Sequence, residues 1–472
     1  MRVFARMLSC WIVASCVAVI ACRVQAQSVL TLRGTVLTPE TVYEDGFITT
    51  KDGRILAAGE SSGQALSGSI QTDSIILPGL VDIHNHITWN FLPRWRTNQL
   101  FANRYEWQQL PSYKIALDVP HREVFQAKGL PCDADRYGEV KAIVGGATSV
   151  VGGLGPVEPD DNRCIIGLAR NLDNYSGFGD PGIINHERVR YEVFPLEMKL
   201  GDAAQVKADL ESGKLKSFLI HLAEGKPSDA ATAREFRMLD KRGDGFVRAG
   251  VSIIHGVALG KSEFEQMAKA KVGLVWAPRS NIELYGATAD VAKAKAAGVK
   301  IALAPDWSPS GSDGLLQELQ YAATWNAAQN PPVFSNSELL AMVTSVPAEL
   351  AGVEKAIGHI APGYYADLLL IRKRNFGAYK TVLRASPADV RLVVINGVGI
   401  YGDPDLMNKL SAGRKLESVS VCGQPKLLYM DPQENIPETH KSFKQIGQEL
   451  ESQLAAWGGS LAPLTACNTP VQ

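Results

Sequence analysis

Residues 77–86 have the sequence LPGLVDIHNH, in which a short apolar run ends in two histidines separated by one residue. Alternate residues of a β-strand share a face, so His84 and His86 are expected to point to the same side. Two imidazoles on one face at a strand end form a chelating pair for a divalent transition metal such as Zn²⁺. Structural roles for both histidines are the alternative, and this motif alone does not exclude them.

Apolar strands alternate with helical stretches along the chain after this motif. Helices are expected at Ser262–Ala270 and at Ala289–Ala297, where Gly298 ends the second one. The expected strands are Val81–Ile83, Thr148–Val151, Phe218–Ile220, Val251–Ile254, Leu274–Trp276 and Lys300–Leu303. Apolar strands in this rhythm are typical of an α/β fold.

Both flanks of the α/β region have the period-two pattern of short antiparallel strands. The first flank is Val29–Gly59, and the pattern returns in Tyr364–Ile371 and Arg391–Ile395 after a helix predicted at Ser337–Leu350. We therefore expect one small β domain that a barrel interrupts. The predicted segments are a signal peptide at 1–26, β-domain parts at 27–78 and 353–401, the barrel at 79–352, and a polar helical extension at 402–472.

Two further histidines and an aspartate are placed like the first pair. His221 and His255 each close an apolar run, so they lie at strand ends on the side where barrel active sites are found. Asp306 follows the last strand-like run and can complete a metal shell. Its alternative role is a helix N-cap before Ser308 and Ser310.

Glu224 lies three residues beyond His221, close enough to face the same pocket without being a ligand. A carboxylate there can accept a proton from metal-activated water and deliver it to a leaving nitrogen. We predict that Glu224 is the catalytic acid/base, with a solvated loop acid as the alternative.

Composition and charge point to a globular enzyme with a small-molecule substrate. The 472 residues are 46% hydrophobic and 21% charged, and the formal net charge of −1 excludes a basic surface for nucleic acid or anionic lipid.

Residues 1–26 have a positive flank, an apolar stretch and a small-residue cleavage site, which are the parts of a signal peptide. They predict export, no remaining membrane span and a mature chain that starts near Gln27. VIAC at 19–22 also resembles a lipobox, in which Cys22 would be lipidated. Homo-oligomerisation stays open.

Four of the seven cysteines lie after the predicted signal. In an oxidising compartment we expect two disulfides, Cys132 with Cys164 and Cys422 with Cys467, because each pair shares one region. The two other pairings and free buried cysteines are the alternatives.

Taken together, these residues resemble the amidohydrolase superfamily over nearly the whole mature chain. The strand-end motifs that carry the resemblance are LPGLVDIHNH at 77–86, HLAE at 221–224, IHG at 254–256, PRSN at 278–281 and Asp306. DGRI at 52–55, GHIAPG at 358–363 and ADL at 366–368 support it. The resemblance implies a distorted (β/α)8 TIM barrel with a small β-sandwich formed from both flanks, and metal-dependent hydrolysis of C–N or related bonds.

The resemblance also implies roles for individual residues. His84, His86, His221 and Asp306 would bind one divalent ion, Zn²⁺ or Fe²⁺, and Asp306 could also take part in proton transfer. His255 would be a catalytic hydrogen-bond donor to the substrate or a ligand of a second metal ion. Binuclear members need a lysine on the fourth strand, and Lys199, the nearest candidate, lies where a helix is as compatible as a strand. We therefore expect one metal ion.

The loop from Ile87 to Gln109 is the main candidate for substrate selection. It is rich in aromatic residues and arginines, which suggests a flat or carboxylated ligand, although the loop can equally be a packed lid. Its members are Trp89, Phe91, Trp95, Tyr105 and Trp107, with Arg94, Arg96 and Arg104. Further pocket candidates by strand-end position are Trp276, Arg279, Asn281 and Trp307.

Three functions remain open. The first is hydrolysis or deamination of a small cyclic amide, amidine or imine. The second is an exported dipeptidase or linear-amide hydrolase with a binuclear site. The third, a metal-bound solute-binding protein, is disfavoured by Glu224, since binding alone needs no proton shuttle.

Overall fold

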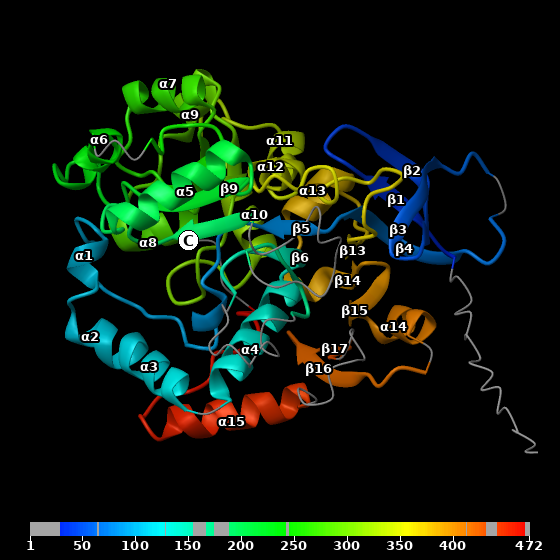
Figure 1. Cartoon of the computed structure of the whole chain (residues 1–472). Helices are drawn as coiled ribbons and strands as arrows, with labels where there is room; N and C mark the ends of the chain where they lie inside the picture. The colour runs from blue at the N-terminus through cyan, green and yellow to red at the C-terminus, as the bar shows by residue number, and fades with distance from the viewer. Residues whose placement is uncertain are drawn as a thin grey trace, which may run out of the picture.

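The structure is a computed structural model of the chain that describes residues 29–63, 66–127, 129–153, 167–173, 188–241, 245–411, 413–430 and 441–467. Its named strands form sheets of nine, five and three strands. Figure 1 shows β1–β4 on one side of the molecule and the helices α5–α9 on the other. Within the described ranges, no helix combines the length and the apolar character that crossing a bilayer requires.

The nine-stranded sheet is built from both flanks of the chain, as expected. Its order is β16-β17-β15-β14-β13-β4-β1-β2-β3. The strands are β1 (Leu30–Leu37), β2 (Val42–Lys51), β3 (Arg54–Glu60), β4 (Ile70–Pro78), β13 (Leu368–Arg372), β14 (Val390–Ile395), β15 (Val398–Gly402), β16 (Glu417–Val421) and β17 (Gln424–Leu428). The flanks meet where β4 pairs antiparallel with β13, with Leu77 opposite Leu369.

Two tight turns hold the hairpins of this sheet together. Asp52-Gly53 and Asn396-Gly397 have positive φ at both positions, between 51° and 77°. Aspartate, asparagine and glycine tolerate this conformation best, so these dipeptides suit two-residue hairpin turns.

Among the described residues, eight parallel strands carry the α/β part of the chain. They are β5 (Leu80–Asp82), β6 (Ala147–Val150), β7 (Arg170–Asn171), β8 (Val189–Glu192), β9 (Ser217–Leu222), β10 (Val251–His255), β11 (Gly273–Trp276) and β12 (Ile301–Leu303). They pair in the orders β5-β6-β7 and β12-β11-β10-β9-β8. A parallel bridge between Asn85 and Asp306 joins the carboxyl ends of β5 and β12. Most of these strands are buried along their whole length, as strands with helices on their outer face must be.

Helices of three to fifteen residues connect and cover the strands (Figure 1). Their bounds are α1 (Arg104–Trp107), α2 (Pro111–Tyr113), α3 (Val119–Gln126), α4 (Leu130–Val144), α5 (Leu200–Ser212), α6 (Glu235–Lys241), α7 (Lys261–Ala270), α8 (Pro278–Tyr285), α9 (Val291–Ala297), α10 (Leu315–Ala327), α11 (Asn336–Ala341), α12 (Ser345–Leu350), α13 (Ala378–Leu383), α14 (Pro404–Leu410) and α15 (Phe443–Ala455).

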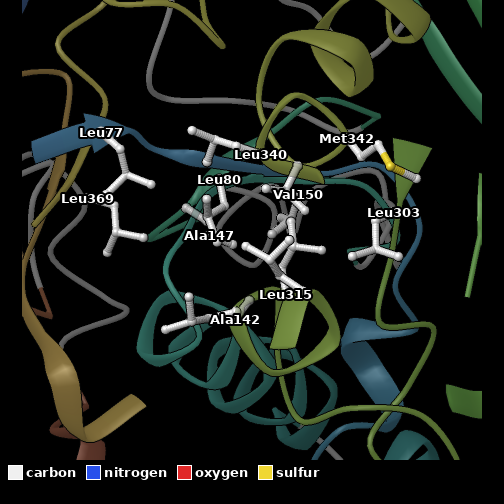
Figure 2. Packing of buried hydrophobic residues seen from close by; sticks show 14 of the residues in the cluster. Leu77, Leu80, Ala142, Ala147, Val150, Leu303, Leu315, Leu340, Met342 and Leu369 are labelled. Carbon is white, nitrogen blue, oxygen red and sulfur yellow. The ribbon is translucent and has the colours of Figure 1, made fainter. Parts of the chain in front are cut away.

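One hydrophobic core continues from the nine-stranded sheet into the parallel strands. Figure 2 shows Leu77 and Leu369 of the large sheet beside Leu80 of β5, with Leu303 and Met342 farther along the same cluster. These five side chains are at most 3% exposed. Full burial of one such side chain contributes about 1.5–3 kcal/mol relative to exposure. The shared core fixes the position of the motif at residues 77–86 relative to both sheets.

Two predictions on secondary structure were wrong. The helix expected at Ser337–Leu350 is two helices, α11 and α12, interrupted at residues 342–344. Pro347 is the physical reason, since proline has no N–H to donate and its ring clashes with a preceding helical carbonyl, whereas the first turn of a new helix tolerates it. The segment after residue 402 is not purely helical, because β16 and β17 extend the large sheet there.

A disulfide ties the end of the chain to this sheet. Cys422, just after β16, is bonded to Cys467, which confirms one predicted pair. The other predicted pair, Cys132 with Cys164, involves residue 164, which lies outside the described residues.

Candidate metal centre and active site

The strand-end histidines and Asp306 converge at one point. His84 and His86 follow β5, His221 lies near the end of β9, His255 ends β10, and Asp306 follows β12. The ligand atoms of His84, His221, His255 and Asp306 all lie within 4.8 Å of one another, and all four residues are buried. His86 is outside this group of four, but its Nε2 is 3.4 Å from Asp306 Oδ1. Five side chains from four strands therefore face one centre.

Backbone and side-chain contacts aim the histidine rings at this centre. His221 Nδ1 lies 3.4 Å from the carbonyl oxygen of Glu192. His255 Nδ1 lies 2.9 Å from Asn281 Oδ1. Each contact occupies the Nδ1 nitrogen and leaves Nε2 facing the centre, which is how the outer partners of metal-binding histidines commonly act.

The donor set fits a divalent metal ion. His221 Nε2 is buried and has no hydrogen-bond partner among the described residues. Leaving such an atom unpaired is costly, and a metal ion at the centre would satisfy it. Imidazoles with one carboxylate are the ligands that Zn²⁺ and similar ions take. The histidines that converge here, together with Asp306, therefore indicate a divalent metal ion.

The protonation states also suit ligands. Burial lowers the pKa of His84 and His221, and it lowers the pKa of His86 to about 4. Burial by itself would raise the pKa of Asp306, but the hydrogen bond with His84 and the charge that His255, His84 and His86 carry when protonated hold this pKa below its ordinary value. Neutral histidines and an ionised aspartate are the forms that bind a cation.

Two of the residues at the centre have an uncommon backbone conformation. His255 and Asp306 have φ values of 69° and 67°, in the left-handed region that non-glycine residues seldom adopt. Such conformations concentrate at functional sites, where the surrounding structure holds them in place. For Asp306, the backbone of His86 contributes, since His86 N donates to the Asp306 carbonyl oxygen at 2.8 Å.

Asp306 is held from both sides, and it is not a helix N-cap. Its Oδ1 lies 3.0 Å from His84 Nε2, and its Oδ2 accepts a hydrogen bond of 2.6 Å from Ser280 Oγ. The next long helix, α10, has Gly314 as its N-cap. The N-cap alternative is therefore excluded.

A buried network that sequence reasoning missed lies beneath the histidine pair. Asp82, fully buried, accepts hydrogen bonds from His84 N at 3.2 Å and from Asn85 Nδ2 at 2.7 Å. Asn85 in turn accepts from Asn90 Nδ2, and Asn90 accepts from Ser308 N, both at 2.8 Å. Burial raises the pKa of Asp82 to about 8. The network connects the strand end that carries His84 to the loop that carries Asp306. In the sequence, the position of Asp82 inside an apolar strand could have indicated this network.

Glu224 lies beside the centre and is only 6% exposed, which excludes a solvated loop acid. Its Oε1 accepts a hydrogen bond of 2.6 Å from the Tyr285 hydroxyl. Its Oε2 lies 3.6 Å from His255 Nε2 and 3.8 Å from Arg104 Nη1. The carboxylate is therefore oriented, and one of its oxygens faces the candidate metal ligands.

A cavity of about 440 Å³ opens above these groups. Its lining residues are His86, Trp89, Arg104, Trp107, Gln108, Gln109, Tyr113, Asp118, Val193, Phe194, His221, Glu224, His255, Asp306 and Trp307. Of the predicted loop residues, Trp89, Trp107 and Arg104 line it, whereas Phe91 and Trp95 pack in a hydrophobic cluster. The loop is thus both a packed lid and a wall of the cavity.

Two of the three arginines of the loop have protein partners. Arg94 Nη1 lies 2.6 Å from Glu283 Oε2, and Arg104 Nη1 donates to the Val193 carbonyl at 2.6 Å. Arg96 lines a separate surface pocket. Apart from its ionisable groups, the cavity is lined mainly by aromatic side chains, which favours a flat ligand.

Of the other residues predicted to line the pocket, some lie at the site and some contact other parts of the protein. Trp307 lines the cavity, and Asn281 contacts His255 from behind. Trp276 donates to Thr288 Oγ1 at 2.7 Å, and Arg279 pairs with Glu283, so both are engaged elsewhere. Lys199 is the N-cap of α5 and does not lie on β8, the fourth strand of the series.

The amino-acid sequence is similar to a known protein family and to curated relatives. The model of the amidohydrolase family matches residues 215–399. A 5-methylthioadenosine/S-adenosylhomocysteine deaminase from Moorella thermoacetica is 26% identical over 394 residues, which cover 75% of this chain and 90% of the relative. These matches support a resemblance to the amidohydrolase superfamily, in agreement with the strand-end motifs. The same matches support an enzyme that acts on carbon–nitrogen bonds of small molecules by metal-dependent hydrolysis, a chemistry that includes deamination.

Solved amidohydrolases share the fold of this chain. An adenosine deaminase from Xanthomonas campestris with bound zinc superposes with a TM-score of 0.65 and 18% identity, covering 91% of this chain and 98% of its own. The guanine deaminase of E. coli superposes with a TM-score of 0.59 and 18% identity, covering 79% and 99%. The expected TIM-barrel class with an attached β domain is thereby confirmed.

Proposed function

We propose that this amidohydrolase deaminates an amino-substituted, planar nitrogen heterocycle and releases ammonia. The observation that carries the proposal is the place of Glu224, whose Oε2 faces the candidate metal ligands at the base of an aromatic cavity. The deaminase named among the relatives supports the same chemistry.

The cavity wall suits a flat ring. Trp307 is in ring contact with two other tryptophans, with centroid distances of 5.8 Å to Trp89 and 5.9 Å to Trp107. Aromatic faces bury a planar ligand well and leave its edge for polar groups. Gln108 and Gln109 also line the cavity, and their amides can both donate to and accept from ring heteroatoms.

The residues of the site have separate tasks in the proposed reaction. His84, His86, His221 and Asp306 would hold one divalent ion, which when bound supplies an activated water molecule as nucleophile. Glu224 accepts a proton from the attacking water and delivers it to the amino nitrogen as the C–N bond breaks. Water oxygen thus replaces nitrogen on the ring carbon, and ammonia leaves. His255 presents Nε2 to the substrate, because Asn281 occupies its Nδ1.

Metal content and ammonia release test this proposal together. We expect about one equivalent of metal per chain, lost in His84→Ala and kept in His255→Ala. Wild type is expected to release ammonia from aminopurine nucleosides or free aminoheterocycles. Glu224→Gln should keep its metal while kcat falls by roughly 10²- to 10⁴-fold, the usual size of a general acid–base contribution.

Other outcomes would replace the proposal. Two equivalents of metal, one of them lost in His255→Ala, together with cleavage of dipeptides, would establish the binuclear amide hydrolase instead. Tight binding of a heterocycle to the metal-loaded protein without any turnover would indicate a solute-binding protein.

A further inference from the structure

A chain of two hydrogen bonds ends on the carboxylate of Glu224. Trp107 Nε1 donates to the Tyr285 hydroxyl oxygen at 2.9 Å, and the Tyr285 hydroxyl donates to Glu224 Oε1 at 2.6 Å. Indole nitrogen can only donate, so the direction of the chain is fixed and the hydroxyl hydrogen of Tyr285 is left for Glu224. All three residues are buried, with exposed fractions of 6%, 1% and 6% for Trp107, Tyr285 and Glu224.

These two hydrogen bonds distinguish the two carboxylate oxygens of Glu224. Oε1 is occupied by the Tyr285 hydroxyl, whereas Oε2 is the oxygen nearest to His255 Nε2, at 3.6 Å. A proton shuttle needs one oxygen free to face the reacting atoms, because a carboxylate that rotates between positions is available for only part of the time. Arg104 Nη1, 3.8 Å from Oε2, adds a positive charge on the same side.

Three segments that are far apart in the sequence hold this arrangement. Tyr285 is the last residue of α8, and Gly286 ends that helix in the left-handed conformation with φ of 67°. Trp107 is the last residue of α1. The backbone beside α1 is fixed to the loop of Glu224, since Arg104 N donates to the Glu224 carbonyl at 3.3 Å and Lys226 N donates to the Ala102 carbonyl at 2.7 Å.

We propose that Tyr285 is a positioning residue that fixes Glu224 with Oε2 toward the candidate metal ligands, and that Trp107 acts on Glu224 through Tyr285. The proposal rests on the function proposed above. Tyr285 is not among the residues that line the cavity, so it acts through Glu224 and does not touch the substrate. Burial and the neighbouring charge of Glu224 raise the pKa of Tyr285 well above its ordinary value, so its hydroxyl remains a donor.

Tyr285→Phe tests the positioning role, because it removes only the hydroxyl. We expect kcat to fall roughly ten- to a hundredfold, the effect of losing a hydrogen bond to a charged group, while KM and metal content stay within about twofold. Tyr401→Phe is the matched control, since the buried Tyr401 hydroxyl, on β15, has no hydrogen-bond partner among the described residues. Its kcat should equal that of wild type.

A double-mutant cycle tests the part of Trp107. Trp107→Phe alone should lower kcat, and it should lower kcat much less in the Tyr285→Phe background, because the path to Glu224 is already broken there. Equal effects of Trp107→Phe in both backgrounds would show that Trp107 does not act through Tyr285.

Crystal structures of the metal-loaded wild type and of Tyr285→Phe supply a readout that needs no substrate. Glu224 is expected in one conformer in wild type and in a rotated or split conformer in the variant. An unmoved Glu224 with unchanged kcat would overturn the positioning role. If wild type deaminates nothing, the proposed function fails, whereas the two structures still decide on the positioning of Glu224.

Discussion

At the scale of single residues, His121 shows how the cavity wall depends on a neutral side chain. Its ring is stacked between Trp89 and Phe125, with centroid distances of 3.7 and 4.2 Å. Burial lowers the pKa of His121 to about 3, the nearby charge of His86 acts in the same direction, and a hydrogen bond with the Thr88 backbone opposes both. The stack supports Trp89, which lines the cavity.

Because the pKa of His121 differs between the folded and the unfolded chain, the free energy of unfolding depends on pH. Between about pH 6.5 and 3 the unfolded chain binds a proton at His121 that the folded chain does not bind, so this group destabilises the fold progressively as pH falls. His121→Phe keeps the stack and removes the proton. We therefore expect the melting temperature of wild type to fall more steeply than that of His121→Phe between pH 6.5 and 4.5, measured by calorimetry. Parallel curves would show that His121 has the same pKa in the folded and in the unfolded chain.

At the scale of elements, the contact between α1 and the loop after β9 depends on Gly225. A Cβ atom on Gly225 would lie 2.6 Å from the carbonyl oxygen of Ala102 and 2.9 Å from Asn103 Cα. Both neighbours are backbone atoms, so Gly225→Ala must push the start of α1 away from Glu224. Trp107 and Arg104 would move with it.

We expect Gly225→Ala to lower kcat/KM roughly ten- to a hundredfold, because displacements of about 1 Å near a reacting centre have effects of this size. Its metal content should remain that of wild type, since the variant leaves every candidate ligand in place. Gly201→Ala is the matched control, because Gly201 lies in the first turn of α5 and an added Cβ meets nothing within 4 Å. Full activity of Gly225→Ala would mean that α1 is not coupled to the site.

The same elements show how far the sequence predicts the site. His84, His221, His255 and Asp306 were recognisable because each ends an apolar strand, and parallel strands bring their carboxyl ends to one edge. Tyr285 was not recognisable, because its role arises only where the ends of α1 and α8 meet the loop of Glu224, and no local sequence pattern encodes that contact. The break between α11 and α12 was missed because the periodicity of residues 337–350 outweighed Pro347.

At the scale of the whole molecule, the C-terminal segment links the β domain to the α/β part. Cys467 is bonded to Cys422 beside β16, while Ala466 N donates to Asp313 Oδ2 at 2.8 Å, beyond β12. Ala462 N donates to the Phe91 carbonyl at 2.8 Å, in the loop that walls the cavity. Disulfides persist in oxidising compartments, so this bond supports the proposal of export that residues 1–26 suggested.

The disulfide joins residues with a sequence separation of 45. Such a bond restricts the unfolded chain, and this typically stabilises a folded protein by about 2–4 kcal/mol. We expect the Cys422→Ser, Cys467→Ser double variant to melt several degrees below wild type, with kcat at 25 °C and metal content retained, because neither cysteine lies at the cavity. Scanning calorimetry measures the shift. Equal melting temperatures would show that contacts of residues 461–466, and not the disulfide, hold the C-terminal segment in place. A separate measurement tests export: the intact mass of wild type from the exported fraction, without reductant, should correspond to a chain that begins at Gln27.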